Sequence, residues 1–121
     1  MDCIFCKILN GDIPGKFIYE DDILACFMDI NPICDGHVLI VPKKHIEDVR
    51  SVDKDTLYHM FEVANKISEK LMKETSEKGY SLSINYGDKQ EVKHLHLHLM
   101  PNYKNKPTMS VEEMYNKLKN I

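Results

Sequence analysis

The sequence predicts an α+β domain with an antiparallel β-sheet and one long helix. Short apolar runs between turn-forming residues predict strands, and one long stretch with apolar residues at three- and four-residue steps predicts the helix. Only that helix separates the predicted strands, which favours an antiparallel sheet over a parallel βαβ array. The chain has 121 residues, so we expect a single domain over residues 1–121.

The first half of the chain is predicted to hold a helical turn and three strands. The turn at residues 3–9 ends where Asn10-Gly11 follows. Pro42 ends the third strand, whose nearly continuous apolar run indicates burial on both faces. The three strands are expected at residues 17–19, 23–28 and 37–41, the first two joined by the acidic turn 20–22.

The second half of the chain begins with the long helix. Asp53 is a suitable N-cap, and we expect the helix to continue to about residue 74, before Lys78-Gly79. Ser110 and Glu113 have the spacing of a capping box at the start of a last helix. The other expected elements are strands at 81–85 and 94–100, a loop at 86–93, and the last helix at 110–119.

Composition limits the function classes that fit. The 16 basic and 19 acidic residues give a formal net charge of −3, which offers no electrostatic basis for binding nucleic acid or an anionic membrane. No apolar run approaches the roughly 20 residues of a transmembrane helix. The N-terminus lacks the basic start and apolar centre of a signal peptide. We therefore expect a cytoplasmic protein whose four cysteines are reduced.

Residues 94–100 hold three histidines in alternation with leucines. Successive side chains of a strand point to opposite faces, so His94, His96 and His98 share one face and the leucines form a core face. The outer two Cα atoms of the histidines lie roughly 13 Å apart in an extended strand. Zinc bonds nitrogen at about 2.0–2.1 Å, so the three rings cannot easily meet on one zinc ion. We expect them to serve different sites.

A second candidate site starts from the Cys3-x-x-Cys6 pair. In a reducing compartment this spacing indicates metal or redox chemistry, and a zinc site needs about four ligands. His45 follows a strand end and His94 begins the histidine strand, so a closed Cys₂His₂ zinc site is one interpretation. The alternative is that Cys3 and Cys6 are small apolar residues buried in a helical turn.

The other two histidines of the strand, His96 and His98, are candidates for an anion site with His37, which opens another strand. Taken alone, His37 better fits a hydrogen-bonded histidine at a strand end. The sequence has no Walker phosphate loop and no serine- or cysteine-centred nucleophile motif, so any catalysis needs a histidine as nucleophile or base. His59 lies off the apolar stripe of the long helix and is expected to be exposed.

The run from His94 to Met100 resembles the signature of the histidine triad (HIT) family. The similarity extends in the same order over residues 3–101 and is closest to the nucleotide-binding branch, the nucleoside phosphoramidases. The loop between Asn85 and His94 is shorter than is usual in that family and lacks the small residues that commonly precede Gln90. The matching blocks are residues 3–8, 20–22, 29–32, 36–45 and 90–92.

The resemblance implies a five-stranded sheet that continues across a homodimer, with a purine nucleotide site in each subunit. It implies that His96 is the nucleophile and that His98 and His37 contact phosphate. It also implies a structural zinc ion on Cys3, Cys6, His45 and His94, and no catalytic cofactor. The residues implied to bind the nucleotide are Ile4, Phe5, Ile8, Phe27, Leu39, Asn85, Gln90 and Asp29, the last through ribose hydroxyls.

The activity that the resemblance implies is hydrolysis at the α-phosphate of adenosine and guanosine phosphoramidates through a covalent nucleotidyl-His96. The second ring nitrogen of His96 must keep its proton, and the carbonyl of His94 is a suitable acceptor. We expect the rate to fall below about pH 6, because a histidine with the reference pKa of about 6.5 becomes protonated there. Two alternatives remain, a dinucleoside polyphosphate hydrolase and a nucleotide-binding or interaction protein without turnover.

Overall fold

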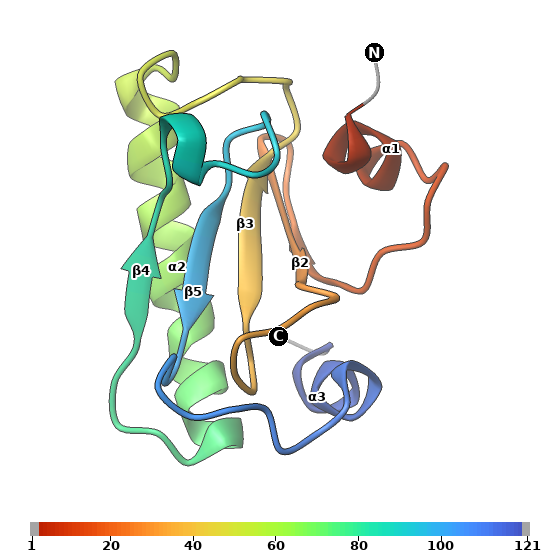
Figure 1. The fold of residues 1–121 in the computed structure, drawn as a ribbon, viewed down its shortest axis with the longest axis vertical. Coiled ribbons are helices and arrows are strands. Elements are labelled where there is room, and N and C mark those ends of the chain that lie inside the picture. The colour runs from red at the N-terminus through yellow and green to blue at the C-terminus, as the bar shows by residue number, and fades with distance from the viewer. Residues whose placement is uncertain (1–2, 120–121) are drawn as a thin grey trace.

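A five-stranded antiparallel sheet with the strand order β1-β2-β3-β5-β4 forms the centre of the molecule (Figure 1). The computed structural model describes residues 3–119, and residues 1–2 and 120–121 of the expected domain lie outside the described residues. The predicted α+β class with an antiparallel sheet is confirmed. The strands are β1 Phe17–Glu20, β2 Leu24–Met28, β3 Val38–Pro42, β4 Ser81–Ser83 and β5 Leu97–Met100.

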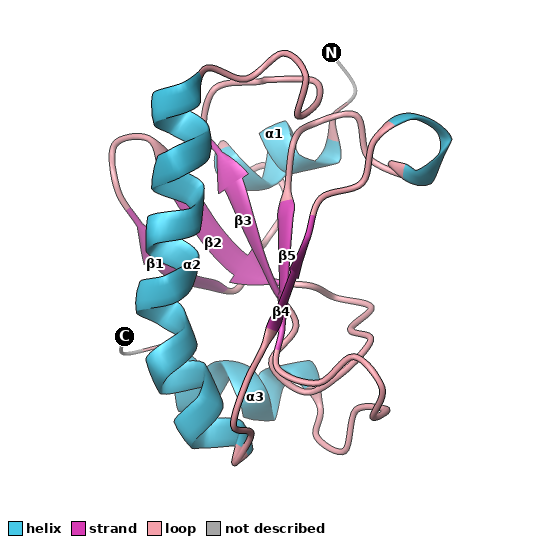
Figure 2. Cartoon of the chain, turned by 90° about the vertical axis from the view of Figure 1, so that its left-hand side faces the viewer, coloured by secondary structure: helices cyan, strands magenta, loops and turns pink. Residues whose placement is uncertain are grey.

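Helices lie on both sides of this sheet (Figure 2). The long helix α2, Lys54–Thr75, packs along one face and starts at Asp53, whose side chain accepts a hydrogen bond from the Thr56 amide at 3.0 Å. Helix α1, Ile4–Leu9, lies on the opposite side. A 3₁₀ turn, η1, and helix α3 complete the fold at Gly87–Lys89 and Val111–Leu118, and α3 has the predicted capping box. Within residues 3–119, no helix combines the length and apolar character that a membrane span requires.

Strands β4 and β5 are shorter than the sequence predicts. Helix α2 ends at Thr75, close to the expected end at about residue 74, and its C-cap Ser76 takes a left-handed conformation with a φ of 59°. Strand β5 begins at Leu97 because its pairing with β3 starts there, although the alternation of buried leucines extends back to Leu95. Strand β4 pairs with β5 from Ser81, opposite Met100, to Ser83, opposite His98. The pairing ends there, so the strand stops at Ser83.

The sheet separates two apolar clusters, and alternation along the strands decides which residue joins which. One cluster lies against α2, and the other lies against α1. The three leucines of the histidine segment are fully buried in the first cluster, which confirms the predicted core face. From β3, the first cluster takes Val38 and Ile40, and the second takes Leu39 and Val41.

His59 is half-buried, and the prediction that it is exposed is wrong. Its Nε2 atom lies 2.7 Å from Asp21 Oδ2, which also accepts a hydrogen bond from the Tyr19 hydroxyl at 2.8 Å. The hydrogen bond to Asp21 raises the pKa of His59. Burial works against ionisation of Asp21, yet hydrogen bonds from the Leu24 amide and the His59 ring hold its pKa below its ordinary value. The prediction considered only the position of His59 relative to the apolar stripe of its own helix. That position does not show that the β1–β2 turn approaches the helix.

We expect His59→Ala to lower the free energy of unfolding by about 1 kcal/mol near pH 5 and by less at pH 8. The raised pKa of His59 gives stability below the unfolded-state value of about 6.5, and this is lost as the pH rises through the folded-state value. The lowered pKa of Asp21 gives stability above about pH 4, and this is lost on acidification. The pair therefore stabilises most between about pH 4 and 6.5.

Urea unfolding of both proteins across this pH range measures the difference. Tyr58→Ala is a matched control, because Tyr58 lies on the same helix and is 69% exposed. A His59→Ala deficit that is the same at pH 5 and pH 8 would contradict the ion pair.

Candidate functional site

The pairing of β3 with β5 brings His37, His96 and His98 to one face of the sheet. The register places Leu39 opposite His98, so alternate residues of the two segments share this face. The ring centroids of His96 and His98 are 4.9 Å apart, and those of His37 and His98 are 5.1 Å apart. His94 instead lies against His45, with a centroid distance of 4.8 Å. The rings of the three histidines of the strand therefore fall into two groups, which is the division that the sequence predicts.

Hydrogen bonds fix the proton positions on His37 and His98. The Ile33 backbone amide donates to His37 Nδ1 at 3.1 Å, so the proton of the neutral ring is on Nε2. That Nε2–H donates to His98 Nδ1 at 2.9 Å, which leaves the His98 proton on its own Nε2. Burial lowers the pKa of His37, and burial lowers the pKa of His98 to about 4. Both rings are therefore neutral near pH 7.

His96 is held in the opposite tautomer. Its Nδ1 atom lies 2.8 Å from the backbone carbonyl oxygen of His94, which can only accept, so Nδ1 donates and carries the proton. The lone pair of the ring is then on Nε2. His96 is only 7% exposed, and this burial lowers the pKa of its ring. The ring is a neutral nitrogen base of fixed orientation, with the hydrogen bond to His94 that the sequence predicts.

A cavity of about 400 Å³ opens beside these histidines. The Asp29 carboxylate lies at its edge, with Oδ2 3.6 Å from His37 Nε2, while Oδ1 accepts a hydrogen bond from the Asn31 amide at 2.8 Å. The cavity is lined by Asp29, Asn31, Ile33, His37, Asn85, Lys89, Glu91 and His98. Two of the residues implied to bind the nucleotide, Asp29 and Asn85, therefore lie in one cavity with two of the histidines.

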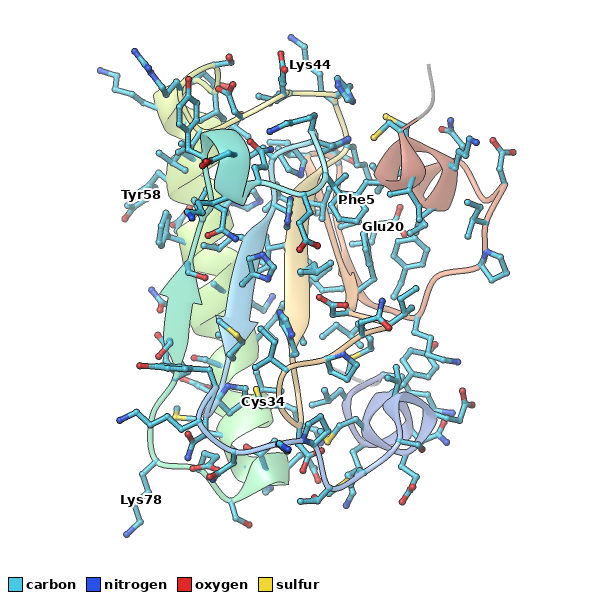
Figure 3. The ribbon with its side chains drawn as sticks, viewed as in Figure 1. Phe5, Glu20, Cys34, Lys44, Tyr58 and Lys78 are labelled. Carbon is cyan, nitrogen blue, oxygen red and sulfur yellow. The ribbon has the colours of Figure 1, made fainter. Side chains whose placement is uncertain are left out.

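Four more of those implied residues form a buried apolar cluster between α1 and the sheet. Phe5 is the central member, and Figure 3 shows it on the side of α1 that faces the strands. Its ring meets the His96 ring edge-on at a centroid distance of 5.0 Å and the Phe27 ring at 5.6 Å. The four residues are Phe5, Ile8, Phe27 and Leu39.

Ile4 and Gln90 lie apart from these groups. Ile4 is 41% exposed and lines a different cavity of about 430 Å³, beside Cys3 and His45. The amide nitrogen of Gln90 is turned to the backbone, where it donates to the carbonyl oxygens of Glu47 at 2.7 Å and Val92 at 2.9 Å. In this structure, Gln90 anchors the loop before the histidine segment.

Asn31, Ile33 and Lys89 also line the cavity, and no sequence pattern assigns them a role. The amide of Ile33 sets the tautomers of two histidines, and no side-chain pattern could reveal a backbone donor. Lys89 stands directly before Gln90, at a position where the resemblance to the HIT family leads us to expect a small residue. The lysine in place of a small residue was the one sequence signal that could have pointed to position 89.

Cys3, Cys6, His45 and His94 converge near the N-terminal end of α1. Each contributes one potential ligand atom, and these atoms all lie within 4.8 Å of one another. The Cys3 Sγ–His94 Nδ1 and Cys6 Sγ–His45 Nδ1 distances are both 3.3 Å. Zinc bonds of about 2.3 Å to sulfur and 2.0–2.1 Å to nitrogen, at tetrahedral angles, would place sulfur and nitrogen about 3.6 Å apart. The four residues therefore fit a zinc ion.

The orientation of His94 also suits a metal ligand. Its Nε2–H donates to the Pro42 carbonyl oxygen at 2.8 Å, so the lone pair on Nδ1 faces the two sulfur atoms. Metal-bound histidines typically donate their second ring N–H in this way. Burial lowers the pKa of His94 and keeps the ring in the neutral form that a metal requires.

A second group of possible ligands, Asp29, His37 and His98, does not fit a metal ion. The three ligand atoms are close enough to one another. However, the His37 atom among them, Nε2, carries the ring proton because Nδ1 accepts from Ile33. A protonated nitrogen has no lone pair for a metal, so His37 and His98 form a hydrogen-bonded pair, with the Asp29 carboxylate 3.6 Å from His37 Nε2.

Comparison with known sequences gives one family. The sequence profile of the HIT domain matches residues 10–105. An uncharacterised HIT-like protein of Methanocaldococcus jannaschii is 44% identical over 103 residues, which cover 84% of this chain and 79% of that protein. An Arabidopsis thaliana protein named adenylylsulfatase HINT3 is 35% identical over 83% of this chain, which spans about half (52%) of that longer protein.

Solved structures agree with the sequence comparison. A zinc-bound histidine triad family protein from Mycobacterium smegmatis superposes with a TM-score of 0.90 at 31% identity, over 98% of this chain and 91% of the other. A hypothetical histidine triad nucleotide-binding protein from Sulfolobus tokodaii gives a TM-score of 0.86 at 30% identity, over 97% and 89%. The predicted fold is confirmed over nearly the whole chain.

We expect the purified protein to contain close to one zinc ion per chain, and Cys3→Ser with Cys6→Ser to abolish zinc binding. Loss of a site that joins α1 to the sheet should lower the melting temperature by roughly 8 °C or more. Metal analysis by mass spectrometry and thermal unfolding with and without a chelator check both effects. Cys34→Ala is the matched control, because Cys34 lies outside the ligand group. A metal-free protein with the same melting temperature as the double variant would refute the site.

Proposed function

The chain belongs to the HIT domain family, and we propose that it is a nucleotide hydrolase acting at the α-phosphate of purine nucleoside phosphoramidates. The observation that carries this proposal is the neutral His96 ring, whose Nδ1–H is held by the His94 carbonyl so that Nε2 is free to attack. An imidazole in this state is a nucleophile at neutral pH. The names of two similar proteins, a nucleotide-binding protein and an adenylylsulfatase, support a nucleotide substrate.

In the first step, the lone pair on His96 Nε2 forms a bond to the α-phosphorus, and the bond from phosphorus to the leaving nitrogen breaks. Nearby N–H donors stabilise the charge that builds on the phosphoryl oxygens, and His98 Nε2–H is such a donor. The relay from Ile33 through His37 sets that proton in place. The departing nitrogen takes a proton from solvent water, which reaches it through the cavity that Glu91 and His98 line.

In the second step, water attacks the phosphorus of nucleotidyl-His96 and the N–P bond breaks. The electron pair returns to Nε2, and the products are a nucleoside monophosphate and the regenerated ring. Splitting hydrolysis into two displacements lowers each barrier. No step passes through a metal ion, and bound zinc would hold α1, His45 and His94 together as a structural cross-link.

The apolar cluster around Phe5 supports a purine base as the ligand beside His96. The cluster includes the apolar side chains of Phe5, Ile8, Phe27 and Leu39. A flat aromatic base suits the edge-on rings there. Reading the exocyclic groups of a base requires a polar partner, so we propose similar use of adenosine and guanosine. Asp29 is proposed to accept from the ribose hydroxyls.

We also propose a homodimer and a cytoplasmic location. Among the strands of residues 3–119, β4 is at the edge of the sheet and pairs with β5 alone, so its other edge can extend the sheet into a second subunit. Zinc ligation by Cys3 and Cys6 requires thiolates, which a reducing compartment preserves. The Mycobacterium smegmatis relative is zinc-bound, which supports zinc as the ion for the four ligands.

A turnover panel tests the proposal. Adenosine and guanosine phosphoramidates are compared with diadenosine polyphosphates under the same conditions. Higher kcat/KM for the phosphoramidates supports the proposal, and higher kcat/KM for the polyphosphates favours the alternative hydrolase. Nucleotide binding without turnover of any substrate would indicate a binding protein.

We expect His96→Asn to lower kcat by at least about three orders of magnitude, because the nucleophile is lost. The affinity for AMP should stay within about tenfold, or 1.4 kcal/mol, since the other contacts remain. Steady-state kinetics and calorimetry measure the two effects. His59→Asn is the matched control, because His59 lies on α2 and pairs with Asp21. Turnover close to that of the control would rule out His96 as the nucleophile.

We expect the midpoint of the acid limb of kcat/KM to lie below the ordinary histidine value of about 6.5. Burial lowers the pKa of His96, so its nucleophilic neutral form persists into more acidic solution. The pH–rate profile measures the midpoint. Zinc content is measured at each pH, since acid also releases metal from thiolate ligands. A midpoint at or above 6.5 with zinc retained contradicts the expectation.

A further inference from the structure

The cavity beside the histidines carries an uneven set of charges. Of its described lining residues, Asp29 and Glu91 carry carboxylates, and Lys89 alone carries an ammonium group. Burial lowers the pKa of His37 and that of His98, to about 4 for His98, so neither ring contributes a charge near pH 7. Any full positive charge that these residues offer a ligand in this cavity therefore comes from Lys89.

The backbone that carries Lys89 is anchored on both sides. Lys89 is the last residue of the turn η1, and Gly87 is the first. The Gly87 carbonyl oxygen accepts hydrogen bonds from Lys93 Nζ at 2.6 Å and from the Gln90 backbone N–H at 3.1 Å. The Gln90 side chain, directly after Lys89, is bonded to the Glu47 carbonyl at 2.7 Å. The turn projects from the side of the sheet opposite α2 (Figure 2), so Lys89 leaves a fixed backbone at the edge of the cavity.

The Lys89 ammonium is uncommitted among the described residues. Within residues 3–119, the ion pairs involve other lysines, such as Lys43 with Glu20 at 2.8 Å. Lys93, on the same loop, is bonded to the Gly87 carbonyl. The side chain of Lys89 is exposed, so its charge is available to a ligand that enters beside His98.

We propose that Lys89 determines leaving-group specificity, by favouring groups that carry negative charge next to the α-phosphate. The chemical class is an oxyanion, either a phosphate chain or a sulfate. An ammonium group attracts such an oxyanion by a charge-assisted hydrogen bond. A neutral amine leaving group carries no negative charge for the ammonium group to attract. This inference rests on the proposed function, because it places the leaving group of His96 in this cavity.

The step with an oxyanion balances without an added acid. His96 Nε2 forms the N–P bond, the P–O bond to the sulfate or phosphate breaks, and the electron pair stays on the departing oxygen. The Lys89 charge stabilises that developing anion in the transition state. Water then cleaves the N–P bond as before. Oxyanion substrates should thus gain more from Lys89 than phosphoramidates, whose nitrogen departs with a proton.

Kinetics of three adenosine substrates test this inference: the phosphoramidate, the 5′-phosphosulfate and diadenosine triphosphate. Lys89→Gln should lower kcat/KM for the two oxyanion substrates by about tenfold relative to the phosphoramidate, and Lys89→Arg should restore most of the ratio. Lys78→Gln is the matched control, an exposed lysine at the far end of the molecule from Lys44 and α1 (Figure 3). If kcat/KM relative to the phosphoramidate falls for only one of the two oxyanion substrates, the result supports the inference and shows whether Lys89 acts on sulfate or on a phosphate chain. A relative change below twofold for both overturns it.

A binding experiment separates failure of this inference from failure of the proposed function. If the wild-type protein turns over none of the three substrates, the proposed function fails, and binding of AMP and ADP is measured in the His96→Asn variant. Adding Lys89→Gln should weaken ADP by about tenfold more than AMP, because the β-phosphate of ADP occupies the position of the leaving group. Equal weakening of both nucleotides overturns the role of Lys89.

Discussion

The register between β3 and β5 is the constraint on which the rest of the structure depends. Leu39 lies opposite His98, and this pairing sends the leucines of residues 94–100 into the core and the histidines to the other face. A slip by one residue would exchange the two sets. Burying three imidazoles against α2 and exposing three leucines would cost several kcal/mol, since each buried leucine contributes roughly 2 kcal/mol. Core packing and site assembly are therefore enforced by the same pairing.

Burial then decides the chemistry of the histidines. Desolvation lowers the pKa values of His37, His94, His96 and His98, so four neighbouring rings are neutral together. Four imidazolium ions at these distances would repel one another strongly. Neutral rings can instead donate from one nitrogen and present a lone pair on the other. Three backbone groups determine which nitrogen of a ring carries the proton. These are the Ile33 amide and the carbonyls of Pro42 and His94.

The sequence predicts most of this fold because its signals are periodic and local. Alternation over residues 94–100, the Asp53 cap and the Ser110–Glu113 capping box each describe one element and agree with the structure. Convergence of elements is not a local property. The approach of Asp21 to His59, the inward turn of the Gln90 amide and the place of Lys89 at the cavity all depend on how loops cross the sheet. Spacing alone carries no information on those directions.

His94 is shared between the two sites, since its ring faces the cysteines and its carbonyl holds the His96 ring. A shared residue gives binding at the two sites a physical route for coupling, and any such coupling is reciprocal. If a nucleotide beside His96 tightens zinc binding by about tenfold, zinc must tighten nucleotide binding by the same factor. The free zinc concentration around the protein then enters its nucleotide affinity as a thermodynamic variable, even though the ion touches no part of the nucleotide.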